Sequence, residues 1–299
     1  MSLLTVTHTT VYRYRQPVRF GDHRLMFRPR DSHDLRLIDA SLTISPPAEV
    51  RWLHDVFSNS IAIAAFQDAA EELRLESRIM LDHFGLTDPD FAIEPYAQIY
   101  PFSYPADEIP DLGRSVERDY PDPDRRIDAW VKGFLDGGGQ VRTQDLLVNI
   151  TRAIHEQFSY TKRHALGTQT PVETLERAGG TCRDLAAFMM GAARALGLAA
   201  RFVSGYLYDP ALDTTLTGGA RESDSDVRGA GDTHAWVQIY LPGAGWVEFD
   251  PTNGLVGGAN LIRVAVAREP FQAVPLQGTF FGAADDFLEM DVDVRVTRG

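Results

Sequence analysis

The sequence of 299 residues contains a single cysteine, Cys182. One cysteine excludes an intramolecular disulfide framework and a cysteine-rich zinc site. The chain also lacks any apolar run close to the roughly 20 residues that a membrane-spanning helix requires. Its first residues lack the basic-then-apolar layout of a secretion signal. We therefore expect a cytoplasmic protein with no membrane partner.

Positive charge is scarce relative to negative charge. The formal net charge is −13 and the pI is near 5.0. Nucleic acids and anionic membrane surfaces select basic patches, so neither is expected as a partner. The remaining composition, with 44% hydrophobic and 24% charged residues, is typical of a globular protein. The length fits one large domain or two of ordinary size.

The pattern of alternation divides the chain into four parts. Residues 1–85 hold several short alternating stretches, which predict an N-terminal antiparallel β-sandwich. Residues 86–123 are proline-rich and weakly periodic, as expected of an irregular connector on the surface. Residues 124–268 carry helical and strand patterns and form the predicted core. In the C-terminal segment, 269–299, residues 287–296 read as one strand, which we expect to return to the N-terminal sheet.

Cys182 stands at the start of a predicted helix. Apolar residues follow it at amphipathic helical spacing, and Gly197 suits the C-terminal cap. The apolar positions are Leu185, Phe188, Met189, Ala192 and Leu196. A helix start favours an anion such as a thiolate, and Gly179 and Gly180 are expected to let backbone and substrate approach closely. These residues alone leave two interpretations open, an inert buried cysteine and a nucleophile.

Two later stretches, 233–241 and 245–252, predict an antiparallel hairpin with its turn at residues 242–245. Their apolar positions must be buried on one face, which places the polar positions, including His234 and Asp250, together on the other. A short turn brings these two residues opposite or diagonal to each other, within cross-strand reach. A carboxylate in this position fixes the histidine tautomer and stabilises the imidazolium. The alternative is a salt bridge on a polar sheet surface.

The other seven histidines fall in predicted strands, loops or ordinary helix faces, and we interpret them as structural. They are His8, His23, His33, His54, His83, His155 and His164.

Residues 209–232 are polar and glycine-rich, which is typical of a surface loop. A lid beside an active site is the alternative interpretation. The acidic residues of this stretch lack the regular spacing of oxygen ligands in a calcium loop, so no metal site is predicted. No cofactor is predicted either.

The sequence resembles the transglutaminase-like superfamily, in particular bacterial proteins with a β-rich N-terminal region. The resemblance in the core rests on Thr170-Pro171, Glu173-Thr174-Leu175, Gly179-Gly180-Thr181-Cys182-Arg183-Asp184, Thr233-His234-Ala235-Trp236 and Trp246 with Phe249-Asp250-Pro251-Thr252-Asn253. In the N-terminal region it rests on His8-Thr9-Thr10, Tyr12-Arg13-Tyr14, His23-Arg24-Leu25 and Arg28-Pro29-Arg30. The similarity therefore extends over most of the chain.

This resemblance implies an α+β fold, with the β-sandwich joined to a papain-like core in which the cysteine helix packs on an antiparallel sheet. It also implies that Cys182 is the nucleophile, that His234 is the general base and acid, and that Asp250 orients His234. Many members have glutamine after the cysteine and an aromatic residue after the aspartate. Arg183 and Leu185 stand at those places here, which bears on fine specificity.

Together these residues predict a thiol-dependent acyl-transfer enzyme that acts on peptide or protein amides through a Cys-His-Asp triad and a thioester. The backbone N–H of Cys182 and the side chain of Tyr160 are the candidate oxyanion donors. Transfer to water, as in a peptidase or amidase, is favoured over transfer to an amine, as in a transglutaminase proper. A non-catalytic binding module on the same fold and a redox-sensing thiol are further alternatives. The substrate and the oligomeric state are not predicted.

Overall fold

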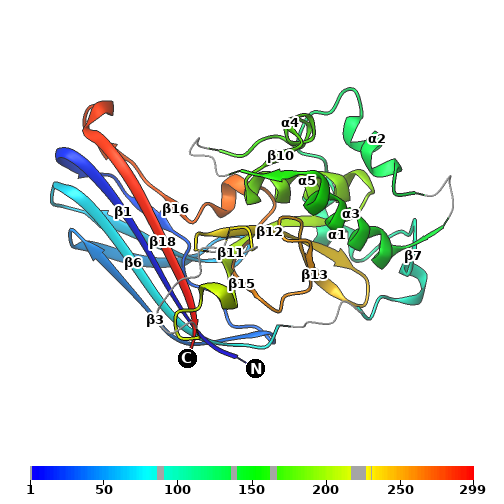
Figure 1. The fold of residues 1–299 in the computed structure, drawn as a ribbon, viewed down its shortest axis with the longest axis horizontal. Helices are drawn as coiled ribbons and strands as arrows, with labels where there is room; N and C mark the ends of the chain where they lie inside the picture. The colour runs from blue at the N-terminus through cyan, green and yellow to red at the C-terminus, as the bar shows by residue number, and fades with distance from the viewer. Residues whose placement is uncertain (1, 86–90, 136–139, 162–166, 217–226, 230) are drawn as a thin grey trace.

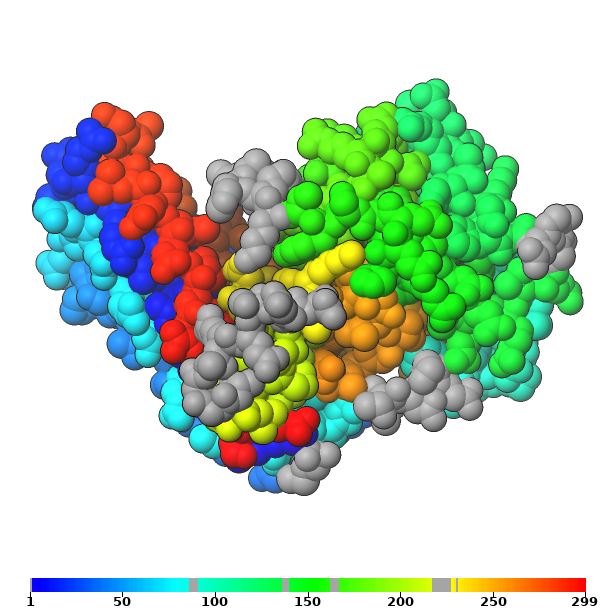
Figure 2. Space-filling view, viewed as in Figure 1, coloured from blue at the N-terminus to red at the C-terminus, as the bar shows by residue number. Residues whose placement is uncertain are grey.

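The computed structural model describes residues 2–85, 91–135, 140–161, 167–216, 227–229 and 231–299. Long strands form one end of the molecule, and a core of helices packed on a sheet forms the other (Figure 1). In the space-filling view, the end of the sandwich that carries the C-terminal strand stands apart from the helices of the core, which leaves a notch between them (Figure 2).

The N-terminal part consists of two antiparallel sheets. The larger sheet contains β3 (Leu35–Ser45), β6 (Ala70–His83), β1 (Ser2–Phe20), β17 (Phe280–Phe281) and β18 (Phe287–Arg298). The smaller sheet contains β16 (Leu276–Gln277), β2 (His23–Leu25), β5 (Ser60–Phe66) and β4 (Ala48–His54). Buried apolar side chains from both sheets, such as Leu25, Ala64 and Leu75, form one cluster. This part is the predicted β-sandwich.

Alternation along β6 determines which of its side chains are buried. Leu73, Leu75, Ile79 and Leu81 are all fully buried and lie on the same face of the strand. Ile79 and Leu81 share a second cluster with Tyr206 and other residues of the core sheet. Each such side chain stabilises the fold by about 1.5–3 kcal/mol. The sandwich is therefore fixed to the core by an apolar contact.

The C-terminal segment returns to the N-terminal sheet. Strand β18 pairs antiparallel with β1, from Leu4 opposite Arg298 to Tyr14 opposite Phe287. The two ends of the chain consequently lie close together (Figure 1). The first strand of the sandwich thus depends on the last strand of the chain for one of its hydrogen-bonded neighbours.

The core is built on a second antiparallel sheet. Its strands, in spatial order, are β14 (Leu255–Val256), β13 (Gly245–Asp250), β12 (His234–Leu241), β11 (Ala200–Leu207) and β15 (Leu261–Ala267). The main helices are α2 (Arg126–Lys132), α3 (Thr143–Gln157), α4 (Pro171–Arg177) and α5 (Cys182–Ala195). No helix within the described ranges is long and apolar enough to span a bilayer.

Shorter elements complete the core and its connections. The short helix and strands are α1 (Ile109–Leu112), β7 (Ile99–Tyr100), β8 (Val141–Arg142), β9 (Ser159–Tyr160) and β10 (Gly179–Gly180). The 3₁₀ turns are η1 (Pro95–Ala97), η2 (Gly113–Ser115), η3 (Pro210–Leu212), η4 (Pro270–Ala273) and η5 (Ala284–Asp286).

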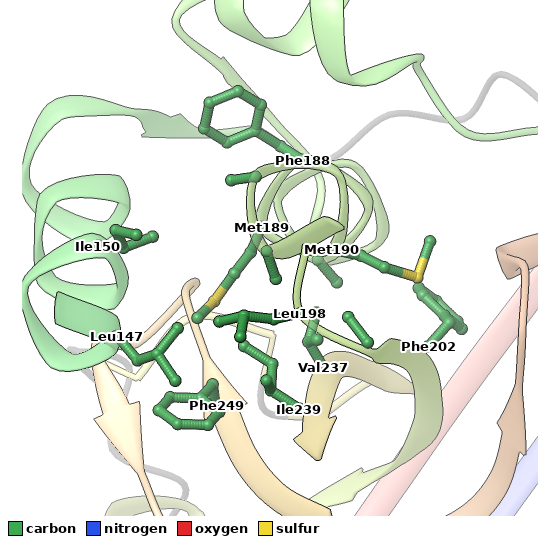
Figure 3. Packing of buried hydrophobic residues seen from close by; sticks show 14 of the residues in the cluster. Leu147, Ile150, Phe188, Met189, Met190, Leu198, Phe202, Val237, Ile239 and Phe249 are labelled. Atoms are coloured by element: carbon green, nitrogen blue, oxygen red, sulfur yellow. The ribbon is translucent and has the colours of Figure 1, made fainter. Parts of the chain in front are cut away.

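Helix α5 packs on the sheet through only part of the predicted apolar stripe, because Phe188 points away from the sheet and packs on Trp130 and Phe158 (Figure 3). Met189 and Met190 lie between the helix and the sheet, and Val237 and Ile239 of β12 lie beneath them (Figure 3). The four side chains are at most 1% exposed. This packing fixes the start of the helix, and hence Cys182, relative to β12.

The expectation that residues 86–123 form a surface connector is wrong for part of that stretch. Ile93 and Ala97 belong to the core cluster around α5, and β7 pairs with β8. The hydroxyl of Tyr104 donates to the carbonyl oxygen of Tyr240. Prolines interrupt regular structure here, but the apolar residues between them still pack against the core, which periodicity alone does not reveal. Residues 86–90 lie outside the described part of the chain.

Candidate active site

Cys182 is the first residue of α5. Thr181 caps the helix, since its side-chain oxygen accepts the Asp184 N–H while the Asp184 carboxylate accepts the Thr181 N–H at 2.8 Å. Asp184 is fully buried, and its other oxygen accepts the Gln169 N–H at 2.7 Å. Cys182 itself is 7% exposed. This capping holds the thiol at the end of the helix that favours an anion.

The two glycines before Cys182 allow close backbone packing rather than access for substrate. A Cβ at Gly179 would lie 2.5 Å from the carbonyl oxygen of Ser159, and one at Gly180 would lie 2.6 Å from Asp184 Cβ. Both distances are shorter than a carbon atom tolerates. The glycines let β10 pair in parallel with β9, which carries Tyr160. They therefore bring Tyr160 next to the start of α5.

His234 and Asp250 are diagonal neighbours on the predicted hairpin. In β12 and β13, Val237 pairs with Phe249 and Leu241 pairs with Gly245, which places Asp250 diagonal to His234 across the hairpin. His234 Nε2 lies 2.8 Å from Asp250 Oδ2, and both side chains are fully buried. The alternation of apolar residues predicted that the two side chains share a face, and the observed register is the diagonal one of the two arrangements left open.

The surroundings of Asp250 keep its carboxylate ionised. Burial opposes ionisation, but the charge and hydrogen bond of His234, together with bonds from Asn253 and Thr252, more than offset it and lower the pKa of Asp250. For His234, burial acts to lower the pKa, while Asp250 and then Cys182 act more strongly in the other direction and raise it to about 10. The geometry therefore favours an imidazolium held beside a carboxylate.

The other nitrogen of His234 is left for the thiol. Nδ1 is buried and has no hydrogen-bond partner of ordinary geometry among the described residues, yet Cys182 is near enough to help raise the pKa of His234. Contacts of this kind often tighten only when a substrate is bound. The structure thus brings Cys182, His234 and Asp250 together in the order thiol, imidazole and carboxylate.

Tyr160 borders the same space. Burial raises the pKa of its hydroxyl above the ordinary value, and nearby Cys182 and Asp232 raise it further, against an opposing effect of Arg183. The hydroxyl therefore keeps its proton and remains a hydrogen-bond donor near the thiol. This is the property required of the second oxyanion donor.

Two further residues support the pair from behind, and neither was assigned a role from the sequence. Trp236 stacks on His234 with ring centroids 5.9 Å apart, and its indole N–H donates to the buried carboxylate of Glu248. Glu248 also accepts from Gln238 and Arg263, each at 2.6 Å. The alternation of β13 places Glu248 on the same face as Asp250, a signal that could have identified it.

Other histidines have structural partners. His8 lies 3.0 Å from the Tyr206 hydroxyl and 3.1 Å from Thr10 Oγ1, and His83 Nε2 lies 3.1 Å from the carbonyl oxygen of Leu261. Within the described residues, His, Cys, Asp and Glu side chains form no group of three that suits a metal ion.

The predicted loop 209–232 is described only in part, because residues 217–226 and 230 lie outside the described residues. Its described beginning packs against the sandwich, where Asp213 accepts the Arg298 N–H at 2.8 Å. Near its end, Val294 of β18 donates its N–H to the Gly231 carbonyl oxygen at 3.2 Å. These two contacts hold the described parts of the loop against the C-terminal strand.

A cysteine at the start of a helix, beside a histidine and an aspartate on an adjacent antiparallel sheet, defines the papain-like class of folds. Residues 129–251 match the transglutaminase-like superfamily, and residues 4–82 match the bacterial transglutaminase-like N-terminal region. The two matches together cover more than half of the chain, which belongs to the transglutaminase-like superfamily.

Similar proteins are known from several bacteria. An uncharacterized protein of Mycobacterium tuberculosis (strain ATCC 25618 / H37Rv) is 27% identical over 303 residues, which cover 97% of this chain and 91% of that protein. An uncharacterized protein of Mycobacterium leprae (strain TN) is 32% identical over 127 residues, 42% of this chain and 40% of that one. The crystal structure of a "putative cysteine protease" from Cytophaga hutchinsonii superposes with a TM-score of 0.67 at 19% identity, covering 99% of this chain and 91% of that chain. The last similarity establishes the fold.

Proposed function

We propose that the protein is a thiol-dependent acyl-transfer enzyme that acts on peptide or protein amides. The observation that carries this proposal is the buried His234–Asp250 pair, whose free nitrogen, Nδ1, is left for Cys182. A thiol activated by a histidine, which is itself oriented by a third group, is the arrangement that nucleophilic catalysis requires.

In the first half of the proposed reaction, the Cys182 thiolate attacks the amide carbon and the carbonyl oxygen becomes an oxyanion. The Cys182 N–H and the Tyr160 hydroxyl donate hydrogen bonds to this oxygen. When the oxyanion collapses, the C–N bond breaks, the His234 imidazolium gives its proton to the leaving amine, and a thioester remains. Asp250 keeps the imidazole in the tautomer that performs this transfer.

In the second half, an acceptor attacks the thioester and gives its proton to His234. The C–S bond breaks, which restores the Cys182 thiolate and the imidazolium. Water yields a carboxylic acid, and an amine yields a new amide. We favour water as the acceptor, in agreement with the description of the similar Cytophaga hutchinsonii protein as a putative cysteine protease. We also propose that the reaction takes place in the cytoplasm.

Incubation of the purified protein with a library of short peptides and simple amides tests the reaction. We expect products that have gained one water, both with and without an added primary amine. The variant Cys182→Ala should form them about 10⁶-fold more slowly, since removing the nucleophile of a catalytic triad has an effect of this size. Mass spectrometry distinguishes acids from amine adducts. Products formed equally by Cys182→Ala would overturn the proposal, and amine adducts alone would identify a transglutaminase.

The variant Tyr160→Phe tests the second oxyanion donor. Loss of one such donor typically lowers kcat by about 10²-fold or more, and we expect the same here with little change in KM. The rate of Cys182 alkylation should stay unchanged, because alkylation forms no oxyanion. A kcat equal to that of the wild type would restrict the role of Tyr160 to packing.

A further inference from the structure

Asn253 contacts two parts of the candidate site at once. Its Nδ2 donates to Asp250 Oδ2 at 2.9 Å and to the carbonyl oxygen of Arg228 at 3.1 Å. Its Oδ1 accepts the Arg228 N–H at 2.8 Å. A single side-chain amide therefore binds the carboxylate that orients His234 and also pairs with both backbone groups of Arg228.

Arg228 belongs to the described segment 227–229, which we call the strap. At its end, Gly229 has a φ of +83°, in the left-handed region. A Cβ at Gly229 would lie 2.7 Å from His234 Nδ1 and 3.7 Å from the Tyr160 hydroxyl oxygen. The strap therefore forms one side of the space in front of Nδ1, where a leaving amine would have to enter.

A second connection holds the strap in the same place. Arg228 Nη1 donates to the carbonyl oxygen of His155 at 3.3 Å, and His155 Nδ1 lies 2.8 Å from the carbonyl oxygen of Thr252. The strap, α3 and the turn after Asp250 thus form one hydrogen-bonded network. Asn253 is its direct link to the candidate catalytic residues.

We propose that Asn253 is a positioning residue that fixes the strap in front of His234 and thereby limits the size of the group that reaches Cys182. This proposal rests on the proposed function, because it assigns a role to the space between thiol, imidazole and strap. The strap lies close against the imidazole, since a methyl group at Gly229 would overlap Nδ1 at 2.7 Å.

Two alkylating reagents with the same reactive group but different bulk test this role. Iodoacetamide is small, whereas 5-iodoacetamidofluorescein carries a large tail, and Cys182 is the only thiol that either can label. Size discrimination is the rate of labelling by iodoacetamide divided by the rate of labelling by 5-iodoacetamidofluorescein. This quotient is divided by the same quotient for N-acetylcysteine, so that a larger value means stronger exclusion of the bulky reagent at the site. In Asn253→Ala we expect this discrimination to fall about fivefold, the equivalent of one lost hydrogen bond.

A matched control is available in the sandwich. Asn59 is buried, pairs with both backbone groups of Val266 at 2.7 and 2.9 Å, and donates to Asp55 at 2.9 Å. Asn59→Ala removes the same kinds of bonds and should lower the thermal unfolding temperature to a comparable extent. Its size discrimination should stay at the wild-type value.

If Asn253→Ala does not fold, Asn253→Ser removes both Nδ2 bonds without adding a charge beside Asp250, and it should behave in the same way. Wild-type discrimination in folded Asn253 variants would overturn the proposal. Failure of the proposed function would appear separately, as iodoacetamide alkylation that does not depend on His234.

Discussion

Replacing His234 by alanine is expected to slow the alkylation of Cys182 by iodoacetamide about 100-fold at pH 6, because the variant loses the cation that stabilises an anionic nucleophile beside it. The thiolate is the species that displaces iodide. Since Asp250 and Cys182 raise the pKa of His234 to about 10, the wild-type imidazolium carries its charge throughout the neutral range. The variant has no cation in that position, so its alkylation rate should increase steadily with pH.

The measurement is direct because the chain has one thiol, and intact mass reports its modification. Cys182→Ala serves as the blank. His8→Ala is the matched control, because His8 is also a buried histidine with two side-chain partners, but it belongs to the sandwich. Its alkylation rate should equal that of the wild type. A pH profile that is identical in wild type and His234→Ala would contradict both the proposed nucleophile and the proposed base.

Most of the candidate site could be predicted from the sequence, because local patterns of residues determine it. The apolar spacing after Cys182 specified helix α5, and the alternation of β12 and β13 specified which side chains of the hairpin share a face. A period-2 pattern with one buried face permits only registers that keep His234 and Asp250 on the same side. These features depend on residues close together in the chain, which is why they were predictable.

Features that depend on contacts between distant segments were not predictable in this way. Asn253 was part of the recognised motif, but its bonds to Arg228 join a turn to a segment about 25 residues earlier, with no periodic pattern to indicate the pairing. The roles of Gly179 and Gly180 likewise depend on the approach of β9. The buried part of the proline-rich stretch depends on the surface that the core happens to present.

The second large effect is on stability. It is expected in the variant Cys182→Ala, which has no thiol whose titration would add to the pH dependence. The free energy of unfolding should fall as pH rises above about 7, by up to about 1.4 kcal/mol for each pH unit. The sign follows from the direction in which Asp250 shifts the pKa of His234. Burial lowers this pKa, and both contributions of Asp250, which exceed those of Cys182, raise it and remain in this background. The folded protein then keeps a proton that the unfolded chain releases near pH 6.5. The stabilisation is complete below that pH and is lost as pH approaches the folded pKa.

Adding Asp250→Asn to this background should remove the decline. Burial, the largest influence on His234, then acts without the opposing carboxylate and lowers the pKa of His234 below 6.5. The unfolded chain would then bind more protons, so stability should instead rise with pH up to about 6.5.

Urea unfolding followed by the fluorescence of the four tryptophans measures both curves. Glu269, whose pKa burial raises to about 7, titrates in both variants and cancels from the difference. Parallel curves between pH 7 and pH 9 would show that Asp250 does not hold His234 in its charged form, and the proposed ion pair would have to be abandoned.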